Sequence, residues 1–173
     1  MRLTKSEHAI LDYLAIHAGE TFYESQISRQ TRISTGSTNQ TLKSLLKRNM
    51  VSLFKKGKMN FYSVNLESTL IKQFKITQTV SELNGLIERL EQLTKRIILF
   101  GSCAEGVDTQ ESDIDLAIVS DEEEKVRHII KKAKASREIQ CLIFNSKEFL
   151  LLDTNDKPLF ERIKHGIVMW RRG

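Results

Sequence analysis

One short stretch of the chain holds the residue types and the spacing most able to do chemistry. Residues 97–100 are apolar without a helical spacing and lead into Gly101-Ser102, which predicts a short buried strand followed by a tight turn. A second apolar run begins right after Asp113 and Asp115. Because residues two apart on a strand point to the same face, these two carboxylates are expected to lie side by side.

The aspartate pair and the turn predict a metal–nucleotide site. Two neighbouring carboxylates repel each other unless a cation lies between them, and Mg²⁺ is commonly held by one or two carboxylates together with substrate phosphates. Gly101 lets the backbone approach a phosphate, and the Ser102 hydroxyl can donate a hydrogen bond to it. We therefore predict Asp113 and Asp115 as metal ligands and catalytic residues, and Gly101 and Ser102 as nucleotide ligands. The alternative is a pair of surface aspartates beside an ordinary strand.

The order Gly101-Ser102, ten intervening residues, then Asp113-Ile114-Asp115 resembles the DNA polymerase beta-like nucleotidyltransferase superfamily, and most of all its minimal members. The resemblance covers about residues 96–170. It implies a mixed sheet with flanking helices, a nucleoside triphosphate such as ATP on the Gly-Ser turn, and Mg²⁺ on the aspartates. It also implies transfer of a nucleoside monophosphate to a hydroxyl acceptor, with release of pyrophosphate.

The resemblance further implies a third carboxylate on the strand that follows the next helix. That helix is predicted over residues 121–136 and the strand over 138–144, which places Gln140 at the matching position. Glutamine carries no charge, so it cannot act as a general base or compensate a second metal ion equally well. Glu138 would share the same strand face and is the candidate third catalytic residue. Both an active enzyme and a domain that only binds nucleotide stay open.

The overall composition is that of a globular protein with one ordinary domain or two small ones. The chain has 173 residues, of which 40% are hydrophobic and 28% charged. The sequence contains neither an apolar run of membrane-spanning length nor a signal peptide, so we expect a cytoplasmic protein without a membrane partner. Cys103 and Cys141 lack the spacing of a zinc site and are predicted to be free thiols.

Positive charge is concentrated in the first third of the chain. Residues 1–66 hold ten Lys/Arg against four Asp/Glu, whereas residues 67–173 hold seventeen against eighteen. Such asymmetry suggests a polyanionic partner for the first segment. Hydrophobic spacing and a capping box at Thr4 and Glu7 predict three helices there, followed by a β-hairpin with the basic tip Lys55-Lys56-Gly57-Lys58.

This order of elements resembles the winged helix-turn-helix family of DNA-binding domains. The resemblance implies that the third helix enters the major groove of double-stranded DNA and that the hairpin contacts phosphates. The predicted DNA-binding residues are Thr35, Ser37, Thr38, Gln40 and Lys43 on the helix and Lys55, Lys56 and Lys58 on the hairpin. The alternative is a winged helix used only for protein contacts.

A long helix is predicted between these two parts. The apolar residues recur at intervals of four and three over residues 76–90, which predicts packing against another helix, either within the chain or across a homodimer axis. The expected α+β chain thus has a winged helix at 1–66, a linker or dimerisation helix at 67–95 and a minimal nucleotidyltransferase domain at 96–173. Two functions are compatible with it: a DNA-tethered nucleotidyltransferase, or a winged-helix transcriptional regulator whose other domain is inactive and only binds nucleotide.

Overall fold

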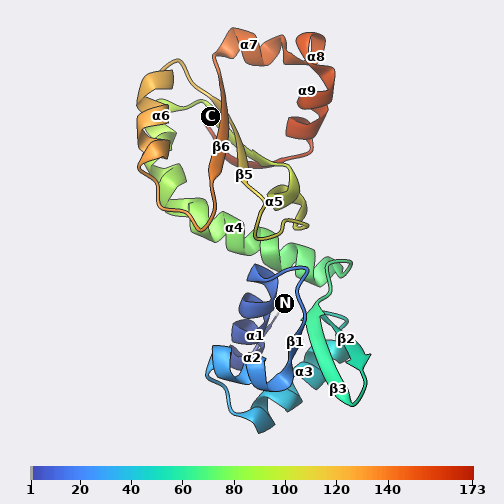
Figure 1. Cartoon of the computed structure of the whole chain (residues 1–173). Coiled ribbons are helices and arrows are strands. Elements are labelled where there is room, and N and C mark those ends of the chain that lie inside the picture. Colours follow the sequence, from blue (N-terminus) through green and yellow to red (C-terminus); the bar gives the residue numbers. More distant parts are fainter. Residues whose placement is uncertain (1) are drawn as a thin grey trace. The chain divides into compact units, whose positions relative to one another are not determined.

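The computed structural model describes residues 2–173, which form two compact units that meet in sequence between Phe74 and Lys75 (Figure 1). Each unit has its own hydrophobic core. Within the described residues, no helix combines the length and the apolar character needed to cross a membrane.

The first unit consists of three helices and a small sheet. Its elements are α1 (Lys5–Ile16), β1 (Phe22–Tyr23), α2 (Glu24–Thr31), α3 (Thr35–Lys47), β2 (Val51–Lys56) and β3 (Met59–Val64). The capping box is present, with the Thr4 amide 2.9 Å from Glu7 Oε2 and the Glu7 amide 3.2 Å from Thr4 Oγ1. The predicted helices and hairpin are thus observed, and β1 adds an unpredicted strand to give the order β1-β3-β2. Membership of the winged-helix family stays a prediction.

The long helix α4 (Thr69–Leu90), followed by the 3₁₀ turn η1 (Glu91–Leu93), does not form a separate middle part of the chain. Ile71 and Phe74 near its start are buried in the core of the first unit, whereas Leu83 and Leu90 are buried in a core of the second. The prediction has boundaries at residues 66 and 95, whereas the chain divides once, between Phe74 and Lys75. Much of the apolar stripe suggested as a dimer seam packs inside the chain's own second unit, and the homodimer stays a prediction.

The second unit is built on a four-stranded mixed sheet with the order β6-β5-β4-β7. Its elements are β4 (Arg96–Phe100), α5 (Ser102–Glu105), β5 (Ile114–Val119), α6 (Glu123–Lys131), β6 (Ile139–Phe144), α7 (Ser146–Leu150), α8 (Leu152–Asn155), α9 (Lys157–Lys164) and β7 (Ile167–Arg171). β5 and β6 are parallel, and the other two pairs are antiparallel. A mixed sheet with helices is what the sequence predicts.

Alternation along the strands directs side chains to two different cores. On one face Leu99, Leu116 and Ile118 pack with residues of α4 and α6, such as Leu83 and Val126. The opposite face carries Ile98, Phe100 and Ala117, which pack with residues of α8 and α9 (Figure 1). Because side chains two apart on a strand share a face, Asp115 lies on the same side as Ala117, the side of α8 and α9.

The helix predicted over residues 121–136 is shorter in the structure, where α6 ends at Lys131. Beyond it, the backbone amide and the hydroxyl of Ser136 both donate to the Glu82 carboxylate on α4. These tertiary hydrogen bonds draw the segment toward α4 instead of extending the helix. The four-residue helices α5 and α8 were not predicted, because they are too short to show a hydrophobic period.

Candidate active site

The turn between β4 and α5 depends on glycine at position 101. Gly101 has φ +70° and ψ −158°, a conformation that L side chains rarely adopt. A Cβ atom here would lie only 2.3 Å from Asp115 Oδ2. The Asp115 carboxylate therefore packs directly against the backbone of the Gly-Ser turn. Since the first amides of a helix have no intrahelical acceptor, the start of α5 leaves N–H groups available for a phosphate.

The two aspartates lie at the start of β5, in the middle of the sheet. Asp113 comes immediately before the strand, and Asp115 is the register partner of Phe100 on β4 and of Gln140 on β6. Burial is the main cause that raises the pKa of Asp115, the positive charge of Arg162 opposes it, and the negative charge of Asp113 adds to it. The structure thus places the Asp115 carboxylate against the Gly-Ser turn, with the Asp113 charge close enough to act on it, and a cation here would relieve their repulsion.

Gln140 occupies the place expected for a third carboxylate and bonds to the pair. Its Nε2 donates a hydrogen bond of 2.5 Å to Asp113 Oδ2. Glu138 precedes β6, where its backbone carbonyl accepts from the Ile114 amide at 2.8 Å, and its side chain is exposed. Of the polar contacts made by residues 2–173, none joins the Glu138 carboxylate to the aspartates. The side chains of Glu138 and Gln140 are both exposed, so exposure does not decide between them, and the role of Glu138 as third catalytic residue stays a prediction.

The donor set fits one hard cation. Asp113 and Asp115 supply carboxylate oxygens, and Mg²⁺ completes its octahedron with waters and substrate phosphates. Across the part of the chain that the structure describes, no group of three or more His, Cys, Asp or Glu side chains is placed to hold a metal ion. Two carboxylates could hold one divalent cation together with the phosphates of a nucleotide.

A cavity of about 410 Å³ opens beside the aspartates, a volume in the range of small-molecule sites. Its lining includes Asp115 and Gln140 from the sheet, the apolar side chains of Phe100, Leu142 and Leu159, and Arg162 from α9. Arg162 was not predicted from the sequence. It is one of many basic residues on short helices, and only the folding of α9 across the sheet brings it to the site.

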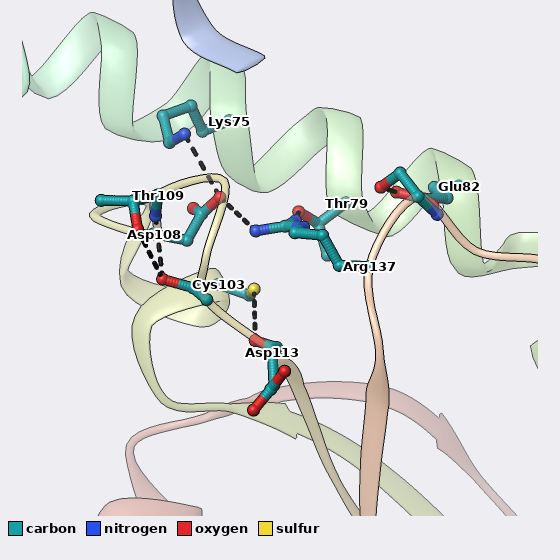
Figure 2. Close-up of polar contacts among 10 residues, drawn as sticks. Lys75, Thr79, Glu82, Cys103, Asp108, Thr109, Asp113 and Arg137 are labelled. Carbon is teal, nitrogen blue, oxygen red and sulfur yellow. Dashed lines mark hydrogen bonds and ion pairs between the residues drawn. The ribbon is translucent and has the colours of Figure 1, made fainter. Parts of the chain in front are cut away.

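A buried ion cluster holds the loop between the Gly-Ser turn and the aspartates (Figure 2). Asp108 is only 5% exposed, and its Oδ2 lies 2.6 Å from Arg137 Nη1 and 3.2 Å from Lys75 Nζ. Arg137 also donates to Thr79 Oγ1 at 3.4 Å, so the cluster ties the loop to α4 and to the residues before β6. It was not predicted, because no local pattern connects these positions.

Cys103 fastens α5 to the same loop. Its buried Sγ donates to the Asp113 carbonyl at 3.3 Å, as the dashed line in Figure 2 marks. Burial raises the pKa of this thiol to about 11, so Cys103 is a neutral hydrogen-bond donor at physiological pH. Cys103 and Cys141 are both free thiols, as predicted.

The predicted DNA-binding residues lie in the first unit, and one of them is not available. Thr35, Gln40 and Lys43 on α3 are exposed, and Ser37 is half-buried. The hairpin residues Lys55, Lys56 and Lys58 are exposed as well. Thr38 is 0% exposed, and its hydroxyl donates to the Ile33 carbonyl at 3.4 Å. Thr38 is therefore a core residue of the unit, and its predicted contact with DNA is withdrawn.

A comparison with known protein families matches a part of the second unit. Residues 80–165 match the nucleotidyltransferase domain. The matched range contains the Gly-Ser turn, both aspartates, Gln140 and Arg162. A crystal structure from Sulfolobus solfataricus, described provisionally as a nucleotidyltransferase, is 16% identical with a TM-score of 0.41, covering 58% of this chain and 87% of that one. A comparison with curated proteins found no match.

Nucleotidyltransferase domains generally use a nucleoside triphosphate and a divalent metal ion, so the match supports nucleotidyl transfer in general terms. It agrees with a site that offers two carboxylates and a glycine turn to a metal-bound triphosphate. The match does not extend to residues 2–79, so it says nothing of the first unit's partners.

Proposed function

We propose that the second unit transfers a nucleoside monophosphate from a nucleoside triphosphate, such as ATP, to a hydroxyl acceptor and releases pyrophosphate. The observation that carries this proposal is the direct packing of the Asp115 carboxylate on Gly101. Metal ligands and a phosphate-binding turn must adjoin for a metal-bound triphosphate to contact both, and this packing supplies that arrangement.

Each residue of the site has a distinct role in the proposal. Asp113 and Asp115 hold Mg²⁺, which when bound neutralises phosphate charge and polarises the phosphoryl group under attack. Gly101 and Ser102 bind the phosphates through backbone amides and the hydroxyl. Gln140 orients Asp113 through its hydrogen bond but cannot accept the proton of the acceptor. Since a positioned general base contributes roughly 10²–10⁴-fold, the wild-type enzyme should turn over slowly.

The bond from Gln140 to Asp113 also favours a second candidate function. A neutral amide at this place preserves metal and nucleotide binding while removing the base, which suits a domain that senses nucleotide without turnover. In that case the chain is a transcriptional regulator whose working part is the first unit. The bond supports this alternative because it keeps Asp113 in position for a metal ion at a place where no base is present.

For the first unit we propose binding of double-stranded DNA. The excess of basic residues in positions 1–66 and the three exposed lysines of the β2–β3 hairpin support this proposal. The exposed residues Thr35, Gln40 and Lys43 of α3 would face the bases, and the hairpin lysines would bind phosphates. We further propose that the protein is cytoplasmic and binds paired DNA half-sites as a homodimer.

Pyrophosphate release tests the proposed reaction. Wild type, Gln140→Asp and Asp113→Ala are incubated with Mg²⁺, each of the four nucleoside triphosphates and a panel of RNA, protein and small-molecule hydroxyl acceptors. Gln110→Asp adds the same charge on the exposed loop and is the matched control for Gln140→Asp. Slow release by wild type, faster release by Gln140→Asp and none by Asp113→Ala would support transfer. Binding without release, with activity only in Gln140→Asp, would identify a nucleotide sensor.

A further inference from the structure

Helix α9 forms one wall of the cavity beside Asp115, and its residues have no role in the proposed reaction so far. Arg162 extends from this helix and lines the cavity together with Asp115 and Gln140. Its guanidinium lies over the Phe100 ring, with Cζ 5.5 Å from the ring centroid. Phe100 is the register partner of Asp115, and Arg162 lines the same cavity as Asp115, so this guanidinium lies close to the predicted metal site.

Within residues 2–173, no side chain accepts a hydrogen bond from the five N–H donors of Arg162. Among the hydrogen bonds and ion pairs of the described residues, none involves this guanidinium, whereas Lys164 on the same helix pairs with Glu161 at 3.7 Å. A cation–π contact with a ring uses none of the N–H donors of a guanidinium, and a planar fork of donors matches phosphate oxygens. Arg162 is therefore oriented without being neutralised by a bonded partner.

Charge balance in the cavity indicates what Arg162 faces. The two aspartates carry two negative charges, and one Mg²⁺ compensates only these. A triphosphate brings further negative charge, and Gln140 provides no carboxylate through which a second metal ion could be held. Arg162 is the one cationic side chain among the residues that line the described cavity. No other side chain that lines this cavity could supply the positive charge of a second metal ion.

We propose that Arg162 is a nucleotide-binding residue that forms hydrogen bonds to the terminal phosphates of the triphosphate. The guanidinium thereby takes over part of the charge compensation that a second metal ion would otherwise provide. This assignment rests on the proposed function of the second unit. It defines the ligand as a nucleotide with a polyphosphate end, because an adenosine or a monophosphate held at the aspartates would lack the groups that Arg162 recognises.

Calorimetric titration of the full chain with ATP, ADP, AMP and inorganic tripolyphosphate, each with Mg²⁺, tests the assignment. Arg162→Gln should weaken ATP and tripolyphosphate binding roughly tenfold to a hundredfold, the loss expected for a hydrogen bond between charged groups. AMP binding should change less than about twofold, because AMP lacks the terminal phosphates. Arg162→Lys keeps the charge without the fork and should be intermediate. Lys164→Gln, on the same helix, should bind like wild type.

The outcomes separate this assignment from the proposed function. If wild type binds ATP in a manner that needs Asp113 and Arg162→Gln binds it equally well, the role of Arg162 is overturned and the site stands. Equal losses for ATP and AMP would overturn it too, because they indicate that Arg162 only packs against Phe100. If wild type binds neither nucleotide nor tripolyphosphate, both proposals fail. Circular dichroism of each variant checks that the fold is retained.

Discussion

Gly101 determines both the conformation of the turn and the position of the Asp115 carboxylate that packs on it. Gly101→Ala would place a Cβ atom 2.3 Å from Asp115 Oδ2 and force a side chain into a backbone conformation at φ +70°. We expect a decrease of about 1–3 kcal/mol in the free energy of unfolding from strain alone. We also expect Mg²⁺-dependent ATP binding to be abolished, because the carboxylate must move. Urea unfolding and calorimetry measure the two effects.

Gly85→Ala is the matched control for that variant. Gly85 lies in α4 with nothing within 4 Å of its hypothetical Cβ and without a positive φ. Since alanine is the better helix former, this change should stabilise the chain by up to about 1 kcal/mol and leave ATP binding unchanged. Equal ATP affinity in Gly101→Ala and Gly85→Ala would contradict the role given to the Gly-Ser turn.

Asp115 should show opposite effects on stability and on binding. Because its pKa is raised, the folded state favours the neutral form, and the ionised carboxylate costs stability at neutral pH. Asp115→Asn should therefore raise the melting temperature without metal by roughly 1–3 °C. The further rise that MgATP gives the wild type by mass action should disappear in the variant. A lower melting temperature, or a retained MgATP shift, would count against the electrostatic description of the pair.

At the scale of elements, the ion cluster around Asp108 fixes the loop that carries the aspartates. Asp108→Ala would leave the buried Lys75 and the half-buried Arg137 without their shared carboxylate. Removal of one partner from a buried ion pair typically costs about 3–5 kcal/mol. Fluorescence of Trp170, the single tryptophan of the sequence, reports urea unfolding of the second unit.

The control for the cluster is an ion pair on the surface of the same unit. Lys95 Nζ lies 2.5 Å from Asp121 Oδ2, and both side chains are substantially exposed. Asp121→Asn should leave the urea midpoint within error of wild type, because solvent screens exposed pairs. An Asp108→Ala midpoint as high as that of Asp121→Asn would show that the buried cluster does not stabilise the loop.

Features that depend on residues close together in the chain could be predicted from the sequence. The strand before Gly101, the turn and the paired carboxylates follow from local patterns, and the structure places them together. The role of Arg162 and the cluster around Asp108 depend on how α9 and α4 fold against the sheet, which no local pattern encodes. Glu138 lies one residue before the start of β6, because alternation gives the face of a strand but not the residue at which the strand begins.

The long helix gives the same lesson. The apolar stripe of α4 predicted an amphipathic helix correctly, and the structure shows which core each end enters. An amphipathic pattern shows that one side of a helix is buried, but it does not show which residues bury it. A separate linker helix and a helix whose ends belong to two different cores therefore have the same sequence pattern. Thr38 is a similar case, because the winged-helix resemblance implied its contact with DNA and did not reveal its burial.

At the scale of the whole molecule, DNA binding should depend on the hairpin lysines and not on net charge alone. The triple variant Lys55→Gln, Lys56→Gln and Lys58→Gln should weaken binding and lower the slope of log affinity against log salt by roughly 3, about one for each phosphate that no longer has a lysine beside it. Fluorescence anisotropy with labelled duplex DNA at several salt concentrations measures this slope.

A second triple variant removes equal charge from the other unit. Lys131→Gln, Lys132→Gln and Lys134→Gln change exposed lysines at the end of α6 and just beyond it, and should leave the salt slope unchanged. If both triple variants bind DNA with equally reduced affinity, the binding is a general attraction to a basic protein and the proposed interface is wrong. Asp113→Ala should bind DNA like wild type.

The most direct test of the central claim is a calorimetric titration of ATP into wild type and Asp113→Ala, with Mg²⁺ and again with the metal chelated. The account predicts binding by wild type that weakens strongly without Mg²⁺, and no Mg²⁺-dependent binding by Asp113→Ala. ATP binding that is the same with and without Mg²⁺, or the same in both proteins, would contradict a metal–nucleotide site at the aspartate pair.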